Sequence, residues 1–345
     1  MKILHIHNLM QRKYGNFNSN YGKKFNNGLI KNNHHVIEFS DRDLLQYEAP
    51  LKIRPLGKKI LNRKLLETCD HFEPDAILIG HSNLIEAQTL QAIYDRLPKV
   101  KIAHWNLDAL WVESNLQRLK FYGDWVDTLF ISTGKTDTPQ LSAIAHKMHF
   151  IPNPCDPAIE IHDHSQQTEL EHDLIFCGVG SANNYRSSFL KALSEQLPSQ
   201  MRFKCCGIYG EEPVWGKDYQ AILAQAKMGL NLNSFEGWPL YSSDRIAQLI
   251  GNGILSFLWD RGGMRRLFND SQVVFFNSVD DCAEKARYYY EHDDERQKIA
   301  AAGRAFYHEQ FSGERITQYM LDVLFNQPET KPYMWTTREE SLFRS

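Results

Sequence analysis

The sequence predicts an α/β protein with two parallel, doubly wound sheets. Three observations indicate this fold class: a length of 345 residues, short apolar segments that alternate with helical segments, and a proline-rich break near the middle. A domain usually has about 100–200 residues, so the length suits two domains. Alternating strands and helices are typical of parallel sheets that helices cover on both faces.

The composition is that of a globular protein. Hydrophobic residues make up 42% and charged residues 23%, and no apolar run approaches the roughly 20 residues of a membrane helix. The chain starts on a strand-like segment with no signal peptide before it, so we expect a cytoplasmic protein. The six cysteines show no C-x-x-C spacing, which predicts reduced thiols rather than a disulfide or zinc framework.

The first half alternates apolar strands with helices. A polar loop with Tyr14, Gly15 and Asn16 follows the first strand, and open α/β sheets place ligands at this end of a strand. We therefore predict that these three residues form an acceptor loop. The predicted strands are 3–7, 36–39, 76–79, 100–103, 128–131 and 149–151, and the predicted helices are 25–30, 84–97 and 139–145.

The first half is also basic. Residues 1–150 hold 20 Lys and Arg against 15 Asp and Glu, whereas the rest holds 19 against 27. Much of the excess lies between Leu51 and Leu66, which from about Leu56 can form an amphipathic basic helix. Such a helix could bind an anionic acceptor or lie on the inner face of a membrane, and the alternative is a solvated helix face. We expect no nucleic-acid partner.

Three prolines at 152, 154 and 157 end the first alternation, because proline fits neither a helix interior nor a central strand. We predict an N-terminal domain at 1–152, a linker at 153–172, a second Rossmann-like domain at 173–326, and a tail at 327–345 that packs back on the first domain. The predicted strands are 174–177, 202–206, 228–232, 254–258 and 273–276. The predicted helices are 185–197, 219–226, 243–250, 264–268, 280–292 and 294–309.

The helix at 243–250 is the centre of the functional prediction. Ser242 and Ser243 are expected to cap its start, and Gly251 to end it. A helix start with hydroxyls and Arg245 beside it suits a phosphate group, because its N–H groups are unpaired and its dipole is positive. The alternative is an ordinary capped helix whose arginine forms a surface ion pair.

Several motifs occur together in the second half. They are Gly178 with Asn184-Tyr-Arg186, then Asn231-Leu-Asn233, then Ser243-x-Arg245 with Gly251-x-Gly253, and Phe275-Phe-Asn-Ser-Val-Asp280. Their order and spacing resemble the two-domain GT-B glycosyltransferases, and more narrowly the CgeB-like, spore-maturation-type group of the glycosyltransferase family 1 superfamily. The resemblance covers about 174–325, and the first half only by architecture and by Trp105 with Asp108.

The resemblance implies two Rossmann-like domains that face each other across a cleft. It implies a metal-independent hexosyltransferase-type enzyme that uses a nucleotide sugar, most simply UDP- or GDP-linked, and no other cofactor. The acceptor would be a cell-surface glycan or its lipid-linked precursor, as in polysaccharide biosynthesis. Members of the group usually carry a glutamate three residues after the arginine, where this chain has Gln248, an amide without charge.

The predicted donor site combines loops after the strands with the start of the central helix. Its glycines let the backbone approach the sugar or diphosphate, its arginines stabilise the leaving diphosphate, and Tyr209 could stack on the nucleoside or be a loop aromatic. A dinucleotide fingerprint is disfavoured because Asn183 replaces its third glycine. The predicted donor residues are Gly178, Gly180, Tyr185, Arg186, Gly207, Tyr209, Tyr241, Ser242, Ser243, Arg245 and Gln248.

If transfer inverts the anomeric centre, a base must deprotonate the acceptor. Asp108 is our first candidate, because it follows the strand at 100–103 and fits the Trp-x-x-Asp of the resembling group. His81 is the second, because it follows the neighbouring strand. A retaining enzyme would need neither residue for this step.

Two alternatives remain open at this point. One is a nucleotide-sugar epimerase on the same double fold, and the other is a sugar- or nucleotide-binding protein with weak or no turnover, which Gln248 favours. No metal motif is convincing: His162 and His164 lie in the linker, and His5 and His7 share one face of a strand without a carboxylate pair beside them.

Overall fold

The computed structural model describes residues 1–17, 20–134, 139–179, 184–208, 211–235, 238–328 and 332–337. The chain forms two compact units, residues 1–152 with 313–333 and residues 153–312 with 334–345. Each unit contains one parallel sheet, which confirms the predicted fold class. Within the described residues, no helix has the length and apolar character needed to cross a membrane.

The first unit has a six-stranded parallel sheet in the order β2-β1-β3-β4-β5-β6. Helices cover both faces, as expected for strands buried on both sides. Its strands are β1 Lys2–His7, β2 His35–Ser40, β3 Ala76–Ile79, β4 Lys101–Asn106, β5 Thr128–Ile131 and β6 Met148–Phe150. Its helices are α1 Tyr21–Lys31, α2 Asp41–Glu48, α3 Arg54–Phe72, α4 Ala87–Arg96, α5 Glu113–Trp125 and α11 Gly313–Leu324, with 3₁₀ turns at Gln11–Lys13, Pro50–Lys52 and Pro139–Lys147.

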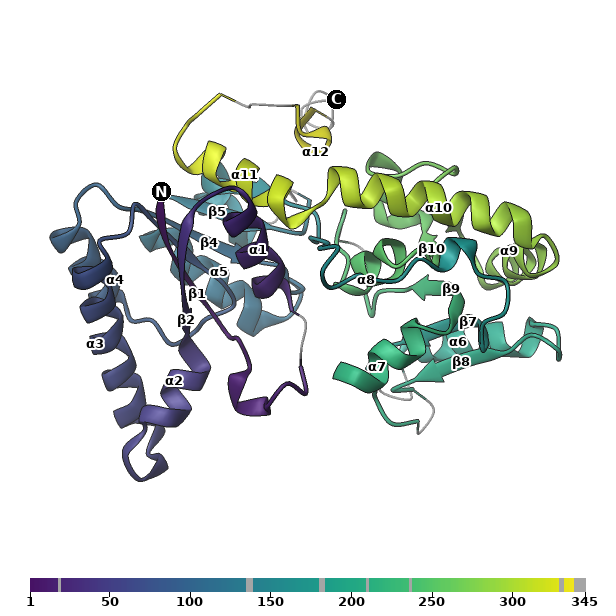
Figure 1. Cartoon of the computed structure of the whole chain (residues 1–345), viewed down its shortest axis with the longest axis horizontal. Coiled ribbons are helices and arrows are strands. Elements are labelled where there is room, and N and C mark those ends of the chain that lie inside the picture. The colour runs from purple at the N-terminus through teal and green to yellow at the C-terminus, as the bar shows by residue number, and fades with distance from the viewer. Residues whose placement is uncertain are drawn as a thin grey trace. The chain divides into compact units, whose positions relative to one another are not determined.

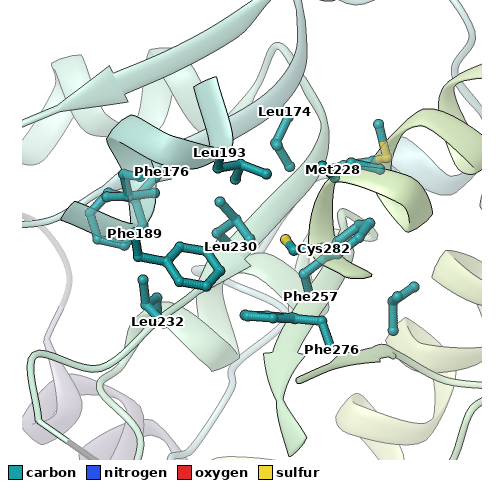
Figure 2. Packing of buried hydrophobic residues seen from close by; sticks show 14 of the residues in the cluster. Leu174, Phe176, Phe189, Leu193, Met228, Leu230, Leu232, Phe257, Phe276 and Cys282 are labelled. Carbon is teal, nitrogen blue, oxygen red and sulfur yellow. The ribbon is translucent and has the colours of Figure 1, made fainter. Parts of the chain in front are cut away.

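The second unit has a five-stranded parallel sheet in the order β11-β10-β9-β7-β8. Figure 2 shows its apolar core, in which Phe176 and Phe189 pack with Leu230 and Leu232. Its strands are β7 His172–Cys177, β8 Phe203–Cys206, β9 Ala226–Asn231, β10 Leu255–Trp259 and β11 Val274–Phe276. Its helices are α6 Tyr185–Gln196, α7 Gly216–Leu223, α8 Arg245–Gly251, α9 Val279–Glu291, α10 Asp293–Gln310 and α12 Met334–Thr337, with 3₁₀ turns at His164–Gln166, Asp260–Gly262 and Met264–Arg266.

The chain crosses between the units three times, which differs from the predicted boundaries. Residues 313–324, predicted to belong to the second domain, form helix α11, which lies beside α1 in the first unit (Figure 1). A Cβ atom on Gly28 of α1 would clash with the backbone carbonyl of Gly313, so the two helices pack at main-chain distance. Asn32 also donates a 2.8 Å hydrogen bond to the Glu314 carbonyl oxygen.

The predicted tail also divides between the units. Tyr333 belongs to the first unit and donates a 2.8 Å hydrogen bond to Asp322 of α11. Helix α12 belongs to the second unit, where Trp335 is buried against Phe311 at a ring distance of 5.9 Å. The tail therefore does not pack on the first domain alone, because Tyr333 and Trp335 have partners in different units.

The segment predicted as a linker is part of the second unit. The N–H of Cys155 donates to the Phe311 carbonyl oxygen at 3.0 Å. Arg296 of α10 is fully buried and donates to the carbonyl oxygens of His164 and Gln167 at 3.2 and 2.6 Å. These bonds fix residues 153–172 against the second sheet's helices, so this segment is ordered structure.

Candidate functional site

Two glycine loops meet at the carboxyl edge of the second sheet. Gly178 follows β7 and Gly207 follows β8, the strand that pairs with β7. Gly207 has a φ of +76°, and a Cβ atom there would clash with the carbonyl oxygen of Gly178. Only glycine therefore allows this approach without strain. Both predicted loop glycines lie at the edge where doubly wound sheets bind ligands.

Arg245, the first residue of α8, points into this edge. Its side chain is 8% exposed and donates 2.9 Å hydrogen bonds to the carbonyl oxygens of Cys177 and Leu232. These carbonyls end β7 and follow β9, so the guanidinium joins two neighbouring strands. The alternative of a surface ion pair is therefore wrong: Arg245 is a buried group with a structural role.

Arg186 lies in the first turn of α6, and its side chain also approaches the carboxyl edge of the second sheet. It is 7% exposed and donates a hydrogen bond to the Val179 carbonyl oxygen. The guanidinium carbons of Arg186 and Arg245 lie 5.4 and 4.7 Å from the centre of the Phe176 ring. Within the described part of the chain, Arg186 has no carboxylate partner, and its Nε is buried without a hydrogen-bond partner.

The two arginines repel one another. Burial, and next the charge of Arg245, lower the pKa of Arg186 to about 10, which leaves it charged at neutral pH. Burying a charge without a counterion is costly in free energy, so a bound anion would relieve both the desolvation and the repulsion. Two guanidinium groups beside a glycine loop suit the binding of phosphate groups, because arginine donates strong hydrogen bonds to phosphate oxygens.

The two serines do not cap α8 as predicted. The helix begins at Arg245 after Asp244, and no side chain caps it. The Ser242 hydroxyl instead accepts a 2.9 Å hydrogen bond from Asn231 and donates one of 3.1 Å to the Ser243 carbonyl oxygen. The Ser243 hydroxyl oxygen is buried without a hydrogen-bond partner among the described residues.

The other predicted donor residues lie in varied surroundings. Tyr185 is 45% exposed at the start of α6 and approaches Trp259 at a ring distance of 6.2 Å. Tyr241 is buried, and its carbonyl oxygen accepts a 3.0 Å hydrogen bond from Asn233. Gln248 donates a 2.6 Å hydrogen bond to Asp244, the residue just before α8. The remaining two, Gly180 and Tyr209, lie outside the described residues.

The two candidate bases lie together at the carboxyl edge of the first sheet. The His81 Nδ1 is 3.4 Å from the Asp108 carboxylate, and the His81 Nε2 accepts a 2.8 Å hydrogen bond from the Leu107 N–H. Burial lowers the pKa of His81 to about 4, an effect that Asp108 only partly offsets. His81 is therefore neutral, and both of its ring nitrogens are engaged.

Asp108 also pairs with a residue that the sequence did not single out. Arg118 of α5 donates to the Asp108 carboxylate at 2.7 Å and to the Asn106 side chain at 2.5 Å. Although burial alone would raise it, the pKa of Asp108 lies below its usual value because His81 and Arg118 stabilise the ionised form. The Asp108 side chain is 38% exposed, so a substrate can reach it.

The predicted acceptor loop continues from the 3₁₀ turn after β1. Tyr14 and Gly15 have positive φ values of 50° and 83°, and the Tyr14 side chain is 91% exposed. The Asn16 N–H donates a 3.0 Å hydrogen bond to the Lys13 carbonyl oxygen. The structure therefore places all three residues on one exposed turn.

The histidines proposed as weak metal candidates have other neighbours. His5 and His7 share a face of β1 as predicted, with ring centres 4.3 Å apart, and His5 Nε2 accepts a 3.2 Å hydrogen bond from Trp105. His162 and His164 stack at 5.1 Å. Among the residues the structure describes, no three His, Cys, Asp or Glu side chains form a metal-ligand group. The six cysteines are free thiols, as expected.

The residues that sequence reasoning missed are those whose role depends on long-range contacts. Phe176 occupies an ordinary apolar strand position, and only the fold places both guanidinium groups over its ring. Arg118 lies in α5, a helix that was not predicted from the sequence. The available indication for Arg118 was that it is a charged residue in the segment that directly follows Asp108, the predicted base.

Residues 186–322 match a family model described as glycosyl transferase-like. The structure resembles HepE from Anabaena in complex with UDP-glucose, with 14% identity, coverage of 94% of this chain and 100% of that chain, and a TM-score of 0.58. The chain has the GT-B fold.

Further structures share the GT-B fold. AviGT4, a glycosyltransferase involved in avilamycin A biosynthesis, is 13% identical over 94% of this chain and 97% of its own, with a TM-score of 0.57. A putative UDP-N-acetylglucosamine 2-epimerase from Listeria monocytogenes is 11% identical over 96% and 98%, with a TM-score of 0.50. The search of curated proteins found no significant match. At these identities the likeness shows the fold, while the glycosyl transferase-like family model covers the segment that carries Arg186 and Arg245.

Proposed function

We propose that this protein is a glycosyltransferase that takes a sugar from a nucleotide-diphosphate donor, with UDP as the first nucleotide to test. The main support is the pair of buried guanidinium groups of Arg186 and Arg245 over Phe176, beside the Gly178 loop. UDP is favoured over GDP because structures of HepE, which shares the fold, were determined with UDP and UDP-glucose.

The proposed reaction joins an acceptor hydroxyl to the anomeric carbon of the donor sugar. The acceptor oxygen forms the new bond, the bond from the anomeric carbon to the β-phosphate oxygen breaks, and the nucleoside diphosphate leaves with the electron pair. Arg186, the Ser243 hydroxyl and the backbone beside Gly178 would stabilise the growing negative charge. Fixed cations and dipoles in a buried site provide such stabilisation without a metal ion.

In an inverting reaction, Asp108 would take the proton from the acceptor hydroxyl. The structure favours Asp108 over His81 for this role, because Asp108 is ionised and partly exposed, whereas the His81 nitrogens face Leu107 and Asp108. We assign His81 and Arg118 the role of positioning the carboxylate. The acceptor class, a surface glycan or a lipid-linked precursor made in the cytoplasm, follows from the family resemblance and the basic first half.

The test is a screen of UDP-, GDP-, ADP-, CMP- and TDP-sugars by thermal shift, followed by product analysis. A ligand that binds the folded state raises the melting temperature in proportion to the logarithm of its concentration over Kd. We expect a UDP-sugar to stabilise the protein and to be hydrolysed slowly when no acceptor is present. An epimerised sugar still attached to UDP would instead identify an epimerase, and binding without any product would identify a binding protein.

A further inference from the structure

The first unit contains two adjoining cavities that share one residue. The larger has a volume of about 600 Å³ and lies between the loop after β3 and helices α3, α4 and α5. The smaller has a volume of about 280 Å³ and lies between the turn after β1, α2 and the start of α3. Asn83 lines both, so the two cavities are neighbours.

The larger cavity has the lining of a sugar site. Gln88, Ser114 and Gln117 offer amides and hydroxyls that can bond to sugar hydroxyls, and Phe121 offers an aromatic ring. Its cations are neutralised, because Lys58 pairs with Glu86 at 3.3 Å and Arg118 with Asp108. A pocket of this volume with few charges suits a neutral hexose unit.

The smaller cavity has the opposite character. Three of its seven lining residues are arginines, Arg12, Arg42 and Arg54, and none is acidic. The charge of Arg12 is balanced by Asp43 at 2.8 Å. In the described ranges of the chain, neither Arg42 nor Arg54 has a carboxylate within ion-pair distance, and Asp41 and Asp108 act on Arg42 only from farther away, so the lining of this cavity is positive.

The charged cavity is connected to the candidate base. Arg42 donates a 3.2 Å hydrogen bond to the carbonyl oxygen of His81, whose ring faces Asp108. The loop of residues 80–84 thus carries His81, and its residues 82–84 line the two cavities. An anion held by Arg42 and Arg54 would place the attached sugar in the larger cavity, which Arg118 lines beside Asp108.

We infer that the first unit binds a sugar that carries a phosphate or diphosphate ester, with the sugar in the larger cavity and the phosphate against Arg42 and Arg54. Arginine suits this ligand because its planar fork donates two hydrogen bonds to phosphate oxygens. The inference deepens the proposed function and rests on it only in calling this ligand the acceptor. The phosphate can belong to a soluble ester or to a lipid.

One observation bears on the source of the phosphate. Leu51, Ile53 and Leu56, at the turn between α2 and α3, are 92%, 43% and 45% exposed, and Arg54 lies among them. Figure 1 shows this turn at the far end of α2 and α3. Leu61 and Leu65, farther along α3, are fully buried, so the predicted amphipathic surface is confined to this turn. Exposed apolar residues beside arginine are suited to an anionic membrane surface.

The test uses calorimetry on the full chain with glucose 1-phosphate as the probe. We expect Arg54→Ala and Arg42→Ala each to weaken binding about tenfold or more, the effect of losing a charged hydrogen bond. Arg63→Ala, an exposed arginine on α3 outside both cavities, should leave the affinity within about twofold of wild type. Arg186→Ala should also leave it unchanged, which separates this site from the donor site.

A second arm distinguishes the two sources. The probe is vesicles of phosphatidylglycerol in phosphatidylcholine. A lipid-borne phosphate is identified if the wild type binds these vesicles, if glucose 1-phosphate releases it, and if Arg54→Ala does not bind them. Binding of the soluble ester alone would identify a soluble acceptor, and either result supports the inference. It is overturned if neither probe shows binding that depends on Arg54, or if glucuronic acid binds and the phosphate ester does not. UDP binding can fail without affecting these results.

Discussion

Arg245 donates a 2.9 Å hydrogen bond to the carbonyl oxygen of Cys177, a residue 68 positions earlier in the chain. This bond joins the start of α8 to the end of β7. A second bond of the same length, to Leu232, joins the guanidinium to the segment after β9. Arg245 therefore positions the carboxyl edge of the sheet, in addition to any contact with a ligand.

Arg245→Ala should lower the free energy of unfolding. Hydrogen bonds from a charged group each contribute about 1.5–3 kcal/mol, so we expect a loss of about 3 kcal/mol in urea unfolding. Arg287→Ala, an exposed arginine on α9 in the same unit, is the matched control and should change stability by less than about 0.5 kcal/mol. Equal unfolding midpoints for the two variants would show that Arg245 does not hold the strands.

Gly207→Ala should disrupt the approach of the two glycine loops. Its φ of +76° disfavours any side chain, and the added methyl group would meet the Gly178 carbonyl oxygen. We expect a loss of about 2 kcal/mol or more in urea unfolding and weaker UDP binding. Gly262→Ala is the control, because a methyl group added there would meet no atom of the described residues within 4 Å. Equal effects at both glycines would refute the close approach.

Asp108→Asn should slow sugar transfer without weakening donor binding. The change removes the proposed proton acceptor but keeps the side-chain shape, and general-base catalysis typically contributes about 10²- to 10⁴-fold. Turnover and the Kd for UDP should be measured on the same preparation, with His81→Gln for comparison. A variant with normal turnover would indicate that Asp108 is not the base, as in a retaining enzyme.

Stability should fall as the pH is lowered from 7 to 5. Burial keeps the pKa of His5 and of His104 well below the ordinary value of 6.5, and that of His81 near 4. The folded chain thus holds fewer protons than the unfolded chain. Stability is full above about pH 6.5 and is lost as the pH falls toward the folded pKa values, by about 2 kcal/mol at pH 5 for each histidine that stays neutral.

Asp41 acts in the opposite direction, because burial raises its pKa and its folded carboxyl then binds a proton more readily. Between pH 7 and pH 5, we expect the stability lost through the three histidines to be larger than the stability gained through this single carboxyl. Urea unfolding at both pH values measures the net change in the free energy of unfolding. His104→Gln should reduce the loss, whereas the exposed His71→Gln should not. A free energy of unfolding that is equal at pH 5 and pH 7 would contradict the assignment of neutral buried histidines.

Much of the fold was predictable because its strands are short apolar runs. Strands β3 and β5 have the predicted limits, since both are buried along their whole length. Helix α2 was missed because Asp41 and Asp43 occupy its buried positions, where an apolar pattern was expected. Helix α11 was not predicted, although it carries a strong apolar stripe, and its contacts with α1, β4 and β5 place it in the first unit.

The candidate site was predictable by location more than by detail. Glycines and polar residues after strands indicated both carboxyl edges, because parallel strands place their ends together. Whether an arginine faces a ligand or backbone carbonyls depends on its depth, which no local pattern gives, and Arg245 bonds to two carbonyls. Capping by Ser242 was predicted from residue type, whereas Asn231 of a neighbouring strand engages that hydroxyl instead.

The affinity of Arg186→Ala for UDP tests the central claim most directly, because Arg186 is buried, charged and has no carboxylate partner among the described residues. Calorimetry should compare wild type, Arg186→Ala and Arg287→Ala, with melting temperatures recorded to confirm folding. We predict that Arg186→Ala weakens UDP binding at least about tenfold while Arg287→Ala matches wild type. A folded Arg186→Ala protein that binds UDP as tightly as wild type would contradict the account.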